Sequence, residues 1–336
     1  MNNSKQIFVV GNSRSGTTMM GRILNNHLDI FTFKELHFFG QLWSEKDKEQ
    51  KINKIESIKL FSKLLCIQKF GIFQQDNPSQ FDEVSKSVLE QDIYTRIKIF
   101  NLFLKYSVGQ NNSSISCNQT PRDVFYINEI LENFPDAKII NMMRDPRDIL
   151  LSQKNKWKRR YLGASSIPFR EAVRSYFNYH PITISKIWNT SVSAALSKNS
   201  NNIISIQFEN LVENSEKEIK KLCLFLGILF SEDLLQVPNI GSSINADKSN
   251  ILGLDNQNTS KWKKGGLMNA EIYICQKMCE NNMRDLNYEF KRFRFFPLFT
   301  TVLILTFPVK IFISFLLNLH RIKNFKELIQ KRILNK

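Results

Sequence analysis

The chain has 336 residues, of which 42% are hydrophobic and 23% are charged, and this suits one large globular domain or two small ones. Its formal net charge of +16 favours anionic partners: nucleic acid, a phosphorylated or sulfated small molecule, or an acidic membrane surface. The sequence contains no helix-turn-helix signature, zinc-finger spacing or aromatic RNA-binding signature, so nucleic acid is the least favoured of the three.

The cysteines and the N-terminus bear on the cellular compartment. Five cysteines are scattered without a C-x-x-C pair, which argues against a disulfide framework and favours buried apolar residues. The first residues, MNNSKQ, lead into an apolar run that is shorter than a signal peptide requires. We therefore expect the main domain to lie in the cytoplasm.

The first motif is GNSRSGTT at residues 11–18, directly after the apolar run at residues 7–10. Its glycines and hydroxyl residues fit the phosphate-loop pattern G-x-x-x-x-G-K-[ST], except that Thr17 stands in place of the lysine. Apolar residues at helical spacing follow over residues 17–28. The segment therefore predicts the strand, loop and helix that a phosphate-binding loop needs.

Such a loop predicts an anion site. Its successive backbone N–H groups form a nest at a helix N-terminus, and the hydroxyls of Thr17 and Thr18 add donors. In nucleoside triphosphatases the missing lysine contacts the β- and γ-phosphates, so its absence argues for a donor with a shorter phosphate chain. Arg14, inside the loop, can contact the transferred group. A glycine turn without a ligand is the alternative for this motif alone.

The remaining elements follow in the order of an α/β fold. Residues 43–75 predict one or two amphipathic helices outside the sheet. A second helix is expected to start at Thr120, followed by buried strands at residues 137–143 and 203–208. Strands that alternate with helices indicate a parallel β-sheet flanked by helices, in which ligands bind at the carboxyl ends of the strands.

The second motif is RDPRDILLS at residues 144–152. Arg144 ends a buried strand, where a guanidinium is costly unless it meets an anion or a carboxylate. Asp145 and Pro146 supply the N-cap and first-turn proline of the next helix, and Ser152 lies two turns along it. Arg144 and Ser152 could together bind a second phosphate. The alternative is a salt bridge from Arg144 to a neighbouring aspartate.

Four segments, in this order, resemble the sulfotransferases that use 3′-phosphoadenosine-5′-phosphosulfate (PAPS). They are GNSRSGTT, KELHFF at 34–39, TPRDVFYINEILENFPDAKIINMMRDPRDILLS at 120–152, and IQFENLVENSEKEIKKLCLFLGI at 206–228. The resemblance spans roughly residues 5–270. It implies the P-loop-like sulfotransferase fold, with a parallel β-sheet flanked by helices, and here a hydrophobic C-terminal helical tail follows it.

The resemblance also assigns residues to the donor. Arg144 and Ser152 would hold the 3′-phosphate of PAPS, and the loop would hold its 5′-phosphosulfate end without a metal. The loop residues concerned are Arg14, Ser15, Gly16, Thr17 and Thr18.

A later segment, WKKGG at 262–266, resembles the family segment that closes over the nucleotide. By this resemblance Lys263 or Lys264, beside Gly265, would reach a phosphate. A solvated lysine loop is the alternative.

Sulfuryl transfer needs in-line attack, positive groups on the leaving phosphate and a base for the acceptor proton. Arg14 can supply the first positive group, and Glu35 occupies the family's general-base position. If Glu35 and His37 share a strand they point to one face, so that His37 orients Glu35 or binds the acceptor. A surface acid and an ordinary histidine are the alternatives. Relatives commonly have a lysine where this chain has Gln119, and neighbouring Arg122 could replace that cation.

The C-terminus predicts contact with a membrane. We divide the chain into a catalytic domain, residues 1–290, and a basic, hydrophobic tail, residues 291–336. As a straight helix, residues 295–319 would be ~37 Å long, beyond the ~30 Å hydrocarbon core of a bilayer. Pro308 and Lys310 interrupt this segment, and basic residues on both sides favour a re-entrant hairpin or an interfacial anchor. The alternative is a helix packed on the catalytic domain or buried in a dimer.

The basic stretch KNKWKRRY at residues 154–161 could bind an acidic acceptor or lipid headgroups. A solvated helix face is the favoured interpretation of this stretch.

The sequence therefore predicts a sulfotransferase attached to the cytoplasmic face of a membrane. It would move a sulfuryl group from PAPS to an acceptor hydroxyl or amine, with a carbohydrate or glycolipid favoured over a protein tyrosine or a small metabolite. The alternatives are a nucleotide kinase or triphosphatase with a variant phosphate loop, and a non-catalytic nucleotide-binding membrane module. Neither the acceptor nor the oligomeric state follows from the sequence.

Overall fold

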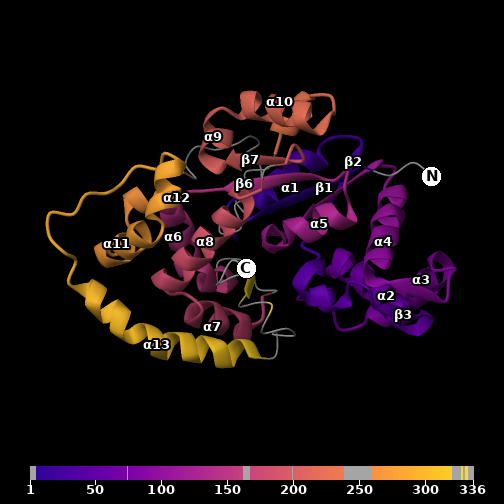
Figure 1. Cartoon of the computed structure of the whole chain (residues 1–336), viewed down its shortest axis with the longest axis horizontal. Helices are drawn as coiled ribbons and strands as arrows, with labels where there is room; N and C mark the ends of the chain where they lie inside the picture. Colours follow the sequence, from indigo (N-terminus) through magenta and orange to yellow (C-terminus); the bar gives the residue numbers. More distant parts are fainter. Residues whose placement is uncertain are drawn as a thin grey trace.

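A five-stranded parallel β-sheet forms the centre of the molecule, in the strand order β2-β5-β1-β6-β7 (Figure 1). The strands are β1 (Gln6–Gly11), β2 (Ile30–Phe33), β5 (Ile115–Gln119), β6 (Lys138–Met143) and β7 (Ile203–Gln207). This computed structural model describes residues 5–73, 75–161, 167–198, 200–237 and 259–319, together with Glu327, Gln330 and Lys331. The predicted parallel sheet is confirmed.

Strand β1 is buried on both faces because helices cover both sides of the sheet. Ile7 and Val9 face one core, and Phe8 and Val10 face the other. A strand covered on both sides has no polar face, which explains the unbroken apolar run before the glycine loop.

The first face, which carries Ile7 and Val9, packs against helices close in sequence to the strand ends. These helices are α1 (Thr17–Asn25), α9 (Phe208–Glu213) and α10 (Ser215–Leu226). Gly227 ends α10 in the left-handed conformation, with φ 60°.

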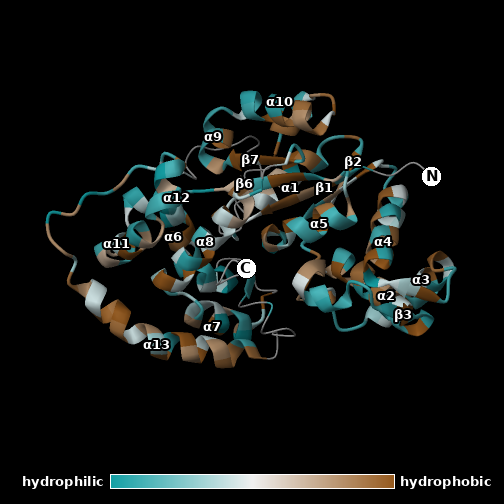
Figure 2. Ribbon diagram, viewed as in Figure 1, coloured by the Kyte–Doolittle hydropathy of each residue, from teal (hydrophilic) through white to brown (hydrophobic). Residues whose placement is uncertain are grey.

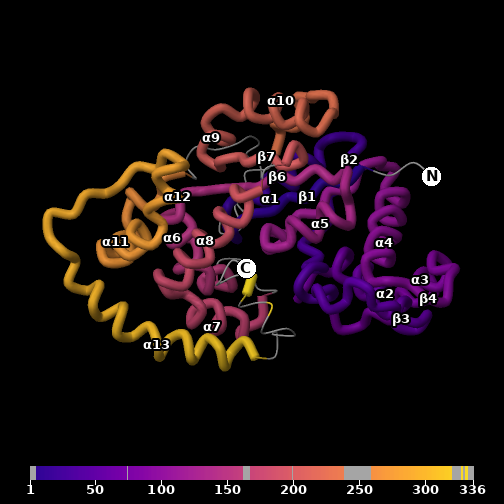
Figure 3. Tube along the Cα trace, viewed as in Figure 1, coloured from indigo at the N-terminus to yellow at the C-terminus, as the bar shows by residue number. Residues whose placement is uncertain are grey.

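The second face packs against helices that come largely from the first half of the chain. They are α2 (Lys54–Phe70), α4 (Arg96–Gln110), the 3₁₀-helix η4 (Pro121–Tyr126), α5 (Ile127–Asn133) and the short π-helical turn η1 (Phe38–Leu42). Smaller elements beside them are η2 (Glu45–Asp47), β3 (Lys51–Asn53), η3 (Pro78–Phe81), α3 (Asp82–Val88) and β4 (Ile93–Thr95). β3 and β4 form an antiparallel ribbon, visible beside α2 in Figure 3, which the sequence analysis did not predict.

A third core lies beyond the carboxyl end of strand β6, around Met143, Trp188 and Cys275. Its helices are α6 (Pro146–Lys154), α8 (Pro181–Leu196), α11 (Asn269–Met278) and α12 (Glu280–Asp285). The 3₁₀-helices η5 (Lys156–Tyr161), η6 (Glu232–Leu235) and η9 (Lys261–Lys264) and the helix α7 (Phe169–Phe177) complete the described part before the tail. All five cysteines are buried and free, as predicted.

The tail contains the long helix α13 (Phe299–Asn318), which runs along the edge of the molecule beside α7 (Figure 1). By length and composition it is the one helix among the described residues that could cross a membrane. Figure 2 shows it mainly in the colours of apolar residues. The division of the chain at residue 290 stays a prediction.

The glycine that ends β1 allows a close approach between β1 and β6. Gly11 has φ 142°, and a Cβ atom there would lie 2.3 Å from the carbonyl oxygen of Met142. We expect Gly11→Ala to lower the free energy of unfolding by ~3 kcal/mol, because backbone strain and a backbone clash add together.

Gly109→Ala is the matched control, since a Cβ at this position in α4 would meet nothing within 4 Å. Its higher helix propensity should leave the protein unchanged or stabilise it by up to ~1 kcal/mol. Urea unfolding of both variants measures the difference, and equal stabilities would contradict the proposed strand contact.

Candidate active site

The loop after β1 has the backbone conformation of an anion nest. Gly16 is the N-cap of α1 with φ 95°, and Arg14 has φ 81°, a left-handed conformation that is rare for a residue with a side chain. A Cβ at Gly16 would lie 2.5 Å from the ring of Phe208, so glycine also permits close packing here. The predicted strand, loop and helix are confirmed, and the loop lies at the carboxyl end of the central strand.

Two side chains of this loop carry buried donors that fit an anion. Among the described residues, the amide nitrogen Nδ2 of Asn12 and the hydroxyl oxygen of Ser15 have no hydrogen-bond partner. Buried polar atoms are normally paired, so these two, together with the loop amides, suit a bound phosphate or sulfate oxygen.

The structure joins the two sequence motifs in one site. Nε of Arg14 donates a hydrogen bond to Oγ of Ser152 at 2.8 Å, and Nη1 of Arg144 donates to the carbonyl oxygen of Arg14 at 3.3 Å. The loop, the residue after β6 and the C-terminal half of α6 therefore meet in one cationic site, although more than a hundred residues separate the loop from the other two in the sequence.

Arg144 is held on several sides. Its guanidinium carbon lies 4.4 Å from the ring centre of Phe208, and its Nη2 is 3.6 Å from Oδ2 of Asp148. Trp188 donates from its indole nitrogen to the carbonyl oxygen of Arg144 at 2.9 Å. The salt bridge considered as an alternative is thus present, but burial raises the pKa of Asp148 despite the nearby arginine. A carboxylate held in this way neutralises Arg144 incompletely.

The start of α6 forms the docking point for the WKKGG segment. Asp145 caps the helix as predicted, accepting from the backbone N–H of Arg147 at 2.8 Å, and also accepts two bonds from its guanidinium at 2.9 and 2.7 Å. The guanidinium of Arg147 stacks on Trp262 at 3.8 Å, and the backbone N–H of Trp262 donates to Asp148 at 2.9 Å. Arg147, which fixes this segment, was not among the residues predicted from the sequence.

The lysines of the same segment are near the site, but point to solvent. Lys263 pairs with Glu289 at 2.8 Å, and Lys264 is exposed. Gly265, with φ 107°, ends the 3₁₀-helix. A phosphate contact by either lysine stays a prediction.

Glu35 and His37 meet through a turn, because both lie beyond the end of β2. The expectation of a shared strand is therefore not met: His37 has φ 50° and begins the turn η1. Nε2 of His37 nevertheless lies 3.2 Å from Oε2 of Glu35, whose side chain remains 40% exposed. Burial favours a higher pKa, but the hydrogen bond and charge of His37, with Arg122 and Lys156, hold the pKa of Glu35 below its usual value.

Four cations surround this carboxylate. Arg14, Arg122, Lys156 and Arg159 each interact electrostatically with Glu35 or with one another. Burial and the charges of Arg159 and Arg144 lower the pKa of Arg14 to about 10, so it remains cationic at neutral pH. Burial, Arg122 and Arg14 lower the pKa of Lys156 to about 8. The stretch at residues 154–161, for which the sequence favours a solvated face, thus supplies Lys156 and Arg159 to the site.

Glu209, another residue that the sequence analysis missed, supports this edge of the sheet. It accepts from the backbone N–H of Asp145 at 2.8 Å and from the hydroxyl of Tyr288 at 3.2 Å. Burial raises the pKa of Glu209 to about 7, against the opposing effect of the hydrogen bond from the backbone of Asp145 and of the charge of Arg144. Its position directly after β7, at the carboxyl edge, was the sequence signal that could have found it.

Gln119 occupies the position where the resemblance leads one to expect lysine. It ends β5 and is buried, and its Oε1 has no hydrogen-bond partner among the described residues. The neutral amide therefore brings no cation to the carboxyl end of β5.

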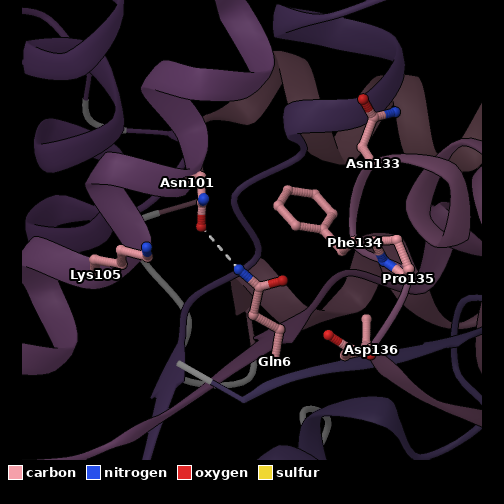
Figure 4. A pocket seen from close by; sticks show the side chains of 8 residues that line it. Gln6, Asn101, Lys105, Asn133, Phe134, Pro135 and Asp136 are labelled. Atoms are coloured by element: carbon pink, nitrogen blue, oxygen red, sulfur yellow. Dashed lines mark hydrogen bonds between the residues drawn. The ribbon is translucent and has the colours of Figure 1, made fainter. Parts of the chain in front are cut away.

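A separate hollow lies at the opposite end of the sheet (Figure 4). Gln6, Asn101, Lys105 and Asp136 are among its lining residues, and Nε2 of Gln6 donates to Oδ1 of Asn101 at 2.9 Å. It begins at the amino end of β1, so it is distinct from the cationic site.

The geometry defines a class: a parallel α/β protein with a cluster of cationic side chains at the carboxyl edge of its sheet, beside the carboxylate of Glu35. A sequence model described as the sulfotransferase family matches residues 6–232, and the chain therefore belongs to the sulfotransferase family.

Individual relatives are distant. A Caenorhabditis briggsae protein named "putative protein-tyrosine sulfotransferase" is 21% identical over 234 residues, which cover 68% of each chain. The sulfotransferase domain from the curacin biosynthetic pathway has a TM-score of 0.51 at 18% identity, over 87% of this chain and 100% of that domain. The sulfotransferase domain of the Synechococcus PCC 7002 olefin synthase has a TM-score of 0.49 at 16% identity, over 87% of this chain and 98% of that domain. The first of these two domains supports the predicted fold.

The lowered pKa of Lys156 gives a prediction about charge in the site. Arg122→Gln removes a neighbouring positive charge and should raise this pKa from about 8 towards the usual value for lysine. Carbon-13 NMR of reductively methylated protein measures it, with the Lys156→Arg spectrum assigning the signal. Arg284→Gln, at an exposed arginine paired with Glu280, is the control. A wild-type pKa near that of free lysine would contradict the described cluster.

Proposed function

We propose that this sulfotransferase uses PAPS as its donor and transfers the sulfuryl group to a hydroxyl or amine. The observation that carries the proposal is the junction of Arg14, Ser152 and Arg144, which unites the glycine loop and the second basic motif in one site. A nucleotide with phosphates at two separate positions suits such a site better than a linear triphosphate does. A kinase or triphosphatase reaction is correspondingly disfavoured.

Two groups of residues would bind the two ends of the nucleotide donor. The loop amides, Asn12, Ser15, Thr17 and Thr18 would bind the 5′-phosphosulfate end, and the donor supplies an activated sulfuryl group there. Arg144 and Ser152 would hold the 3′-phosphate. Trp262, fixed on Arg147 and Asp148, would bring the WKKGG segment over the nucleotide.

Glu35 is suited to accept the acceptor's proton. Its lowered pKa keeps it ionised at neutral pH, and the imidazole of His37 holds one of its oxygens. Arg14 and Lys156 can stabilise the negative charge that develops on the transferred group and the leaving phosphate, because both are already held close to Glu35.

We further propose a carbohydrate or glycolipid acceptor and attachment to the cytoplasmic face of a membrane. The exposed apolar helix α13 motivates both, since a membrane-bound enzyme meets lipid-linked sugars at the surface. The C. briggsae relative's name makes a tyrosine hydroxyl the second candidate.

Calorimetric titration with adenosine 3′,5′-bisphosphate tests the donor site. We expect micromolar binding of the bisphosphate, much weaker binding of 5′-AMP and Mg-ATP, and a roughly 10- to 100-fold loss of affinity in Arg144→Ala, as removal of a charge-assisted hydrogen bond predicts. Arg284→Ala, at an exposed arginine, is the matched control, and thermal unfolding verifies that each variant is folded. Preferential binding of Mg-ATP, or no binding by folded protein, would overturn the donor assignment.

Transfer from PAPS to an alkyl galactoside, an alkyl glucoside and a tyrosine peptide tests the acceptor class. We expect product with a glycoside, and Glu35→Gln should reduce turnover by roughly 10²- to 10⁴-fold while leaving bisphosphate affinity intact, because the amide cannot take the proton. Glu56→Gln, in the distant helix α2, should have no effect. Product with the tyrosine peptide alone would reject the carbohydrate proposal but retain sulfuryl transfer.

A further inference from the structure

Helix α13 exposes a row of apolar side chains on its outer face. Leu305 is 73% exposed, Val309 63% and Phe312 61%. Phe295 and Leu298, just before the helix, are 77% and 83% exposed. Contiguous exposure of this kind indicates a surface that is covered in the cell.

The inner face of the same helix is fixed by polar contacts at its C-terminal end. Oδ1 of Asn178 accepts hydrogen bonds from Ser314 at 2.6 Å and from Asn318 at 2.8 Å. Nη1 of Arg174 donates to Oδ1 of Asn318 at 2.8 Å. These bonds tie the last two turns of α13 to α7 and the residue that follows it.

Further contacts tie the middle and start of the helix. The ammonium of Lys310 lies 5.3 Å from the ring centre of Tyr176 and 5.9 Å from that of Tyr179. A ring nitrogen of His180 is 3.2 Å from the carbonyl oxygen of Leu303. A transmembrane position would break these contacts and place Lys310 in hydrocarbon, at a cost of several kcal/mol.

The positive charge on and beside α13 favours an anionic lipid surface as the partner that covers its outer face. From Lys291 to Leu319 the sequence contains four basic residues and no acidic one. Arg292 and Arg294 are exposed next to the exposed rings of Phe295 and Phe296. Basic side chains beside aromatic and aliphatic ones match the anionic headgroups and upper acyl chains of a lipid bilayer.

We propose that α13 lies flat in the interface of an anionic bilayer, with its outer face in the upper acyl chains, and does not cross the bilayer. This rests on the membrane attachment proposed above and is independent of the sulfuryl-transfer chemistry. The inner face stays on α7, so membrane binding leaves the fold unchanged.

The same packing places the bilayer on the acceptor side of the site. Tyr176 of α7, which contacts Lys310, also packs edge-on against Trp157 of η5, with ring centres 5.9 Å apart. Trp157 follows Lys156, which is part of the cationic cluster around Glu35. An acceptor held in the bilayer would therefore approach the site from the side of η5.

Vesicle sedimentation tests the surface. The full chain should sediment with vesicles of equal phosphatidylcholine and phosphatidylglycerol, and less with phosphatidylcholine alone. Replacement of Leu305, Val309 and Phe312 by glutamate should reduce sedimentation at least about tenfold, because apolar area is lost and anionic lipid repels the new charges. The matched control is Leu224→Glu with Leu229→Glu, at residues 83% and 85% exposed elsewhere on the molecule.

Cysteine accessibility tests the orientation. Arg294→Cys and Leu319→Cys flank α13, and the five native cysteines are buried, so an impermeant maleimide should report the new thiols. In a bacterial host, a flat helix on the cytoplasmic face leaves both positions labelled in inverted membrane vesicles and neither labelled in spheroplasts. Labelling of one position from each side would show a spanning helix and overturn the proposal.

Two other outcomes would also overturn it and leave the chemistry standing. If the wild-type protein binds adenosine bisphosphate but neither vesicle type, the outer face does not bind lipid. If light scattering shows a dimer that the triple glutamate variant loses, with no vesicle binding, a second copy of the chain covers the face. Loss of bisphosphate binding in folded wild-type protein would instead reject the proposed donor, whatever the vesicles show.

Discussion

The guanidinium of Arg144 connects most of the parts that build the site. It lies at the carboxyl end of β6, where it donates a hydrogen bond to the backbone of the glycine loop and stacks on Phe208. The guanidinium also pairs with Asp148, and the indole of Trp188 donates to the backbone carbonyl oxygen of Arg144. These contacts bring together the loop after β1, the start of α6, the helix α8 and the start of α9. The guanidinium forms a buried salt bridge with Asp148, and the proposed 3′-phosphate would add a second anionic partner to its environment. The packing at this edge of the sheet therefore depends on the same residue that we propose holds the 3′-phosphate of the donor.

The positive charges around Glu35 impose a second constraint. The cluster holds four like charges that repel one another: Arg14, Arg122, Lys156 and Arg159. Burial and this repulsion together lower the pKa values of Arg14 and Lys156. The fold holds these groups close before any ligand arrives, so their reorganisation is not required when negative charge develops. A bound anion would raise the pKa values of Arg14 and Lys156 again, because a negative charge favours their protonated forms.

The sequence predicts those parts of the site whose signals are local. Glycine spacing identified the loop, and Asp145 with Pro146 identified the start of α6, because turns and helix caps are set by a few adjacent residues. For Lys156 and Arg159 the sequence favoured a solvated face over acceptor binding, because η5 reaches Glu35 through its packing against α7 rather than through any local pattern. Glu35 and His37 were paired correctly for the wrong reason: a left-handed turn at His37, not strand alternation, brings their side chains together. The ribbon of β3 and β4 escaped notice because strands of three residues show no periodicity.

Gln119 places a neutral side chain at the end of β5, where the family resemblance leads one to expect a lysine, yet the site remains positively charged. The buried amide at the end of β5 offers no cation, yet Glu35 is still surrounded by positive charge from η4 and η5. Arg122 lies on η4, three residues after Gln119, and Lys156 lies on η5, which follows α6. These two elements bring positive charge to the neutral carboxyl end of β5. Because a lysine in η5 is held by α7, and α7 in turn holds α13, the cation is linked structurally to the apolar tail. Part of the positive charge that β5 lacks, that of Lys156, is thus supplied from the side of the molecule on which α13 lies.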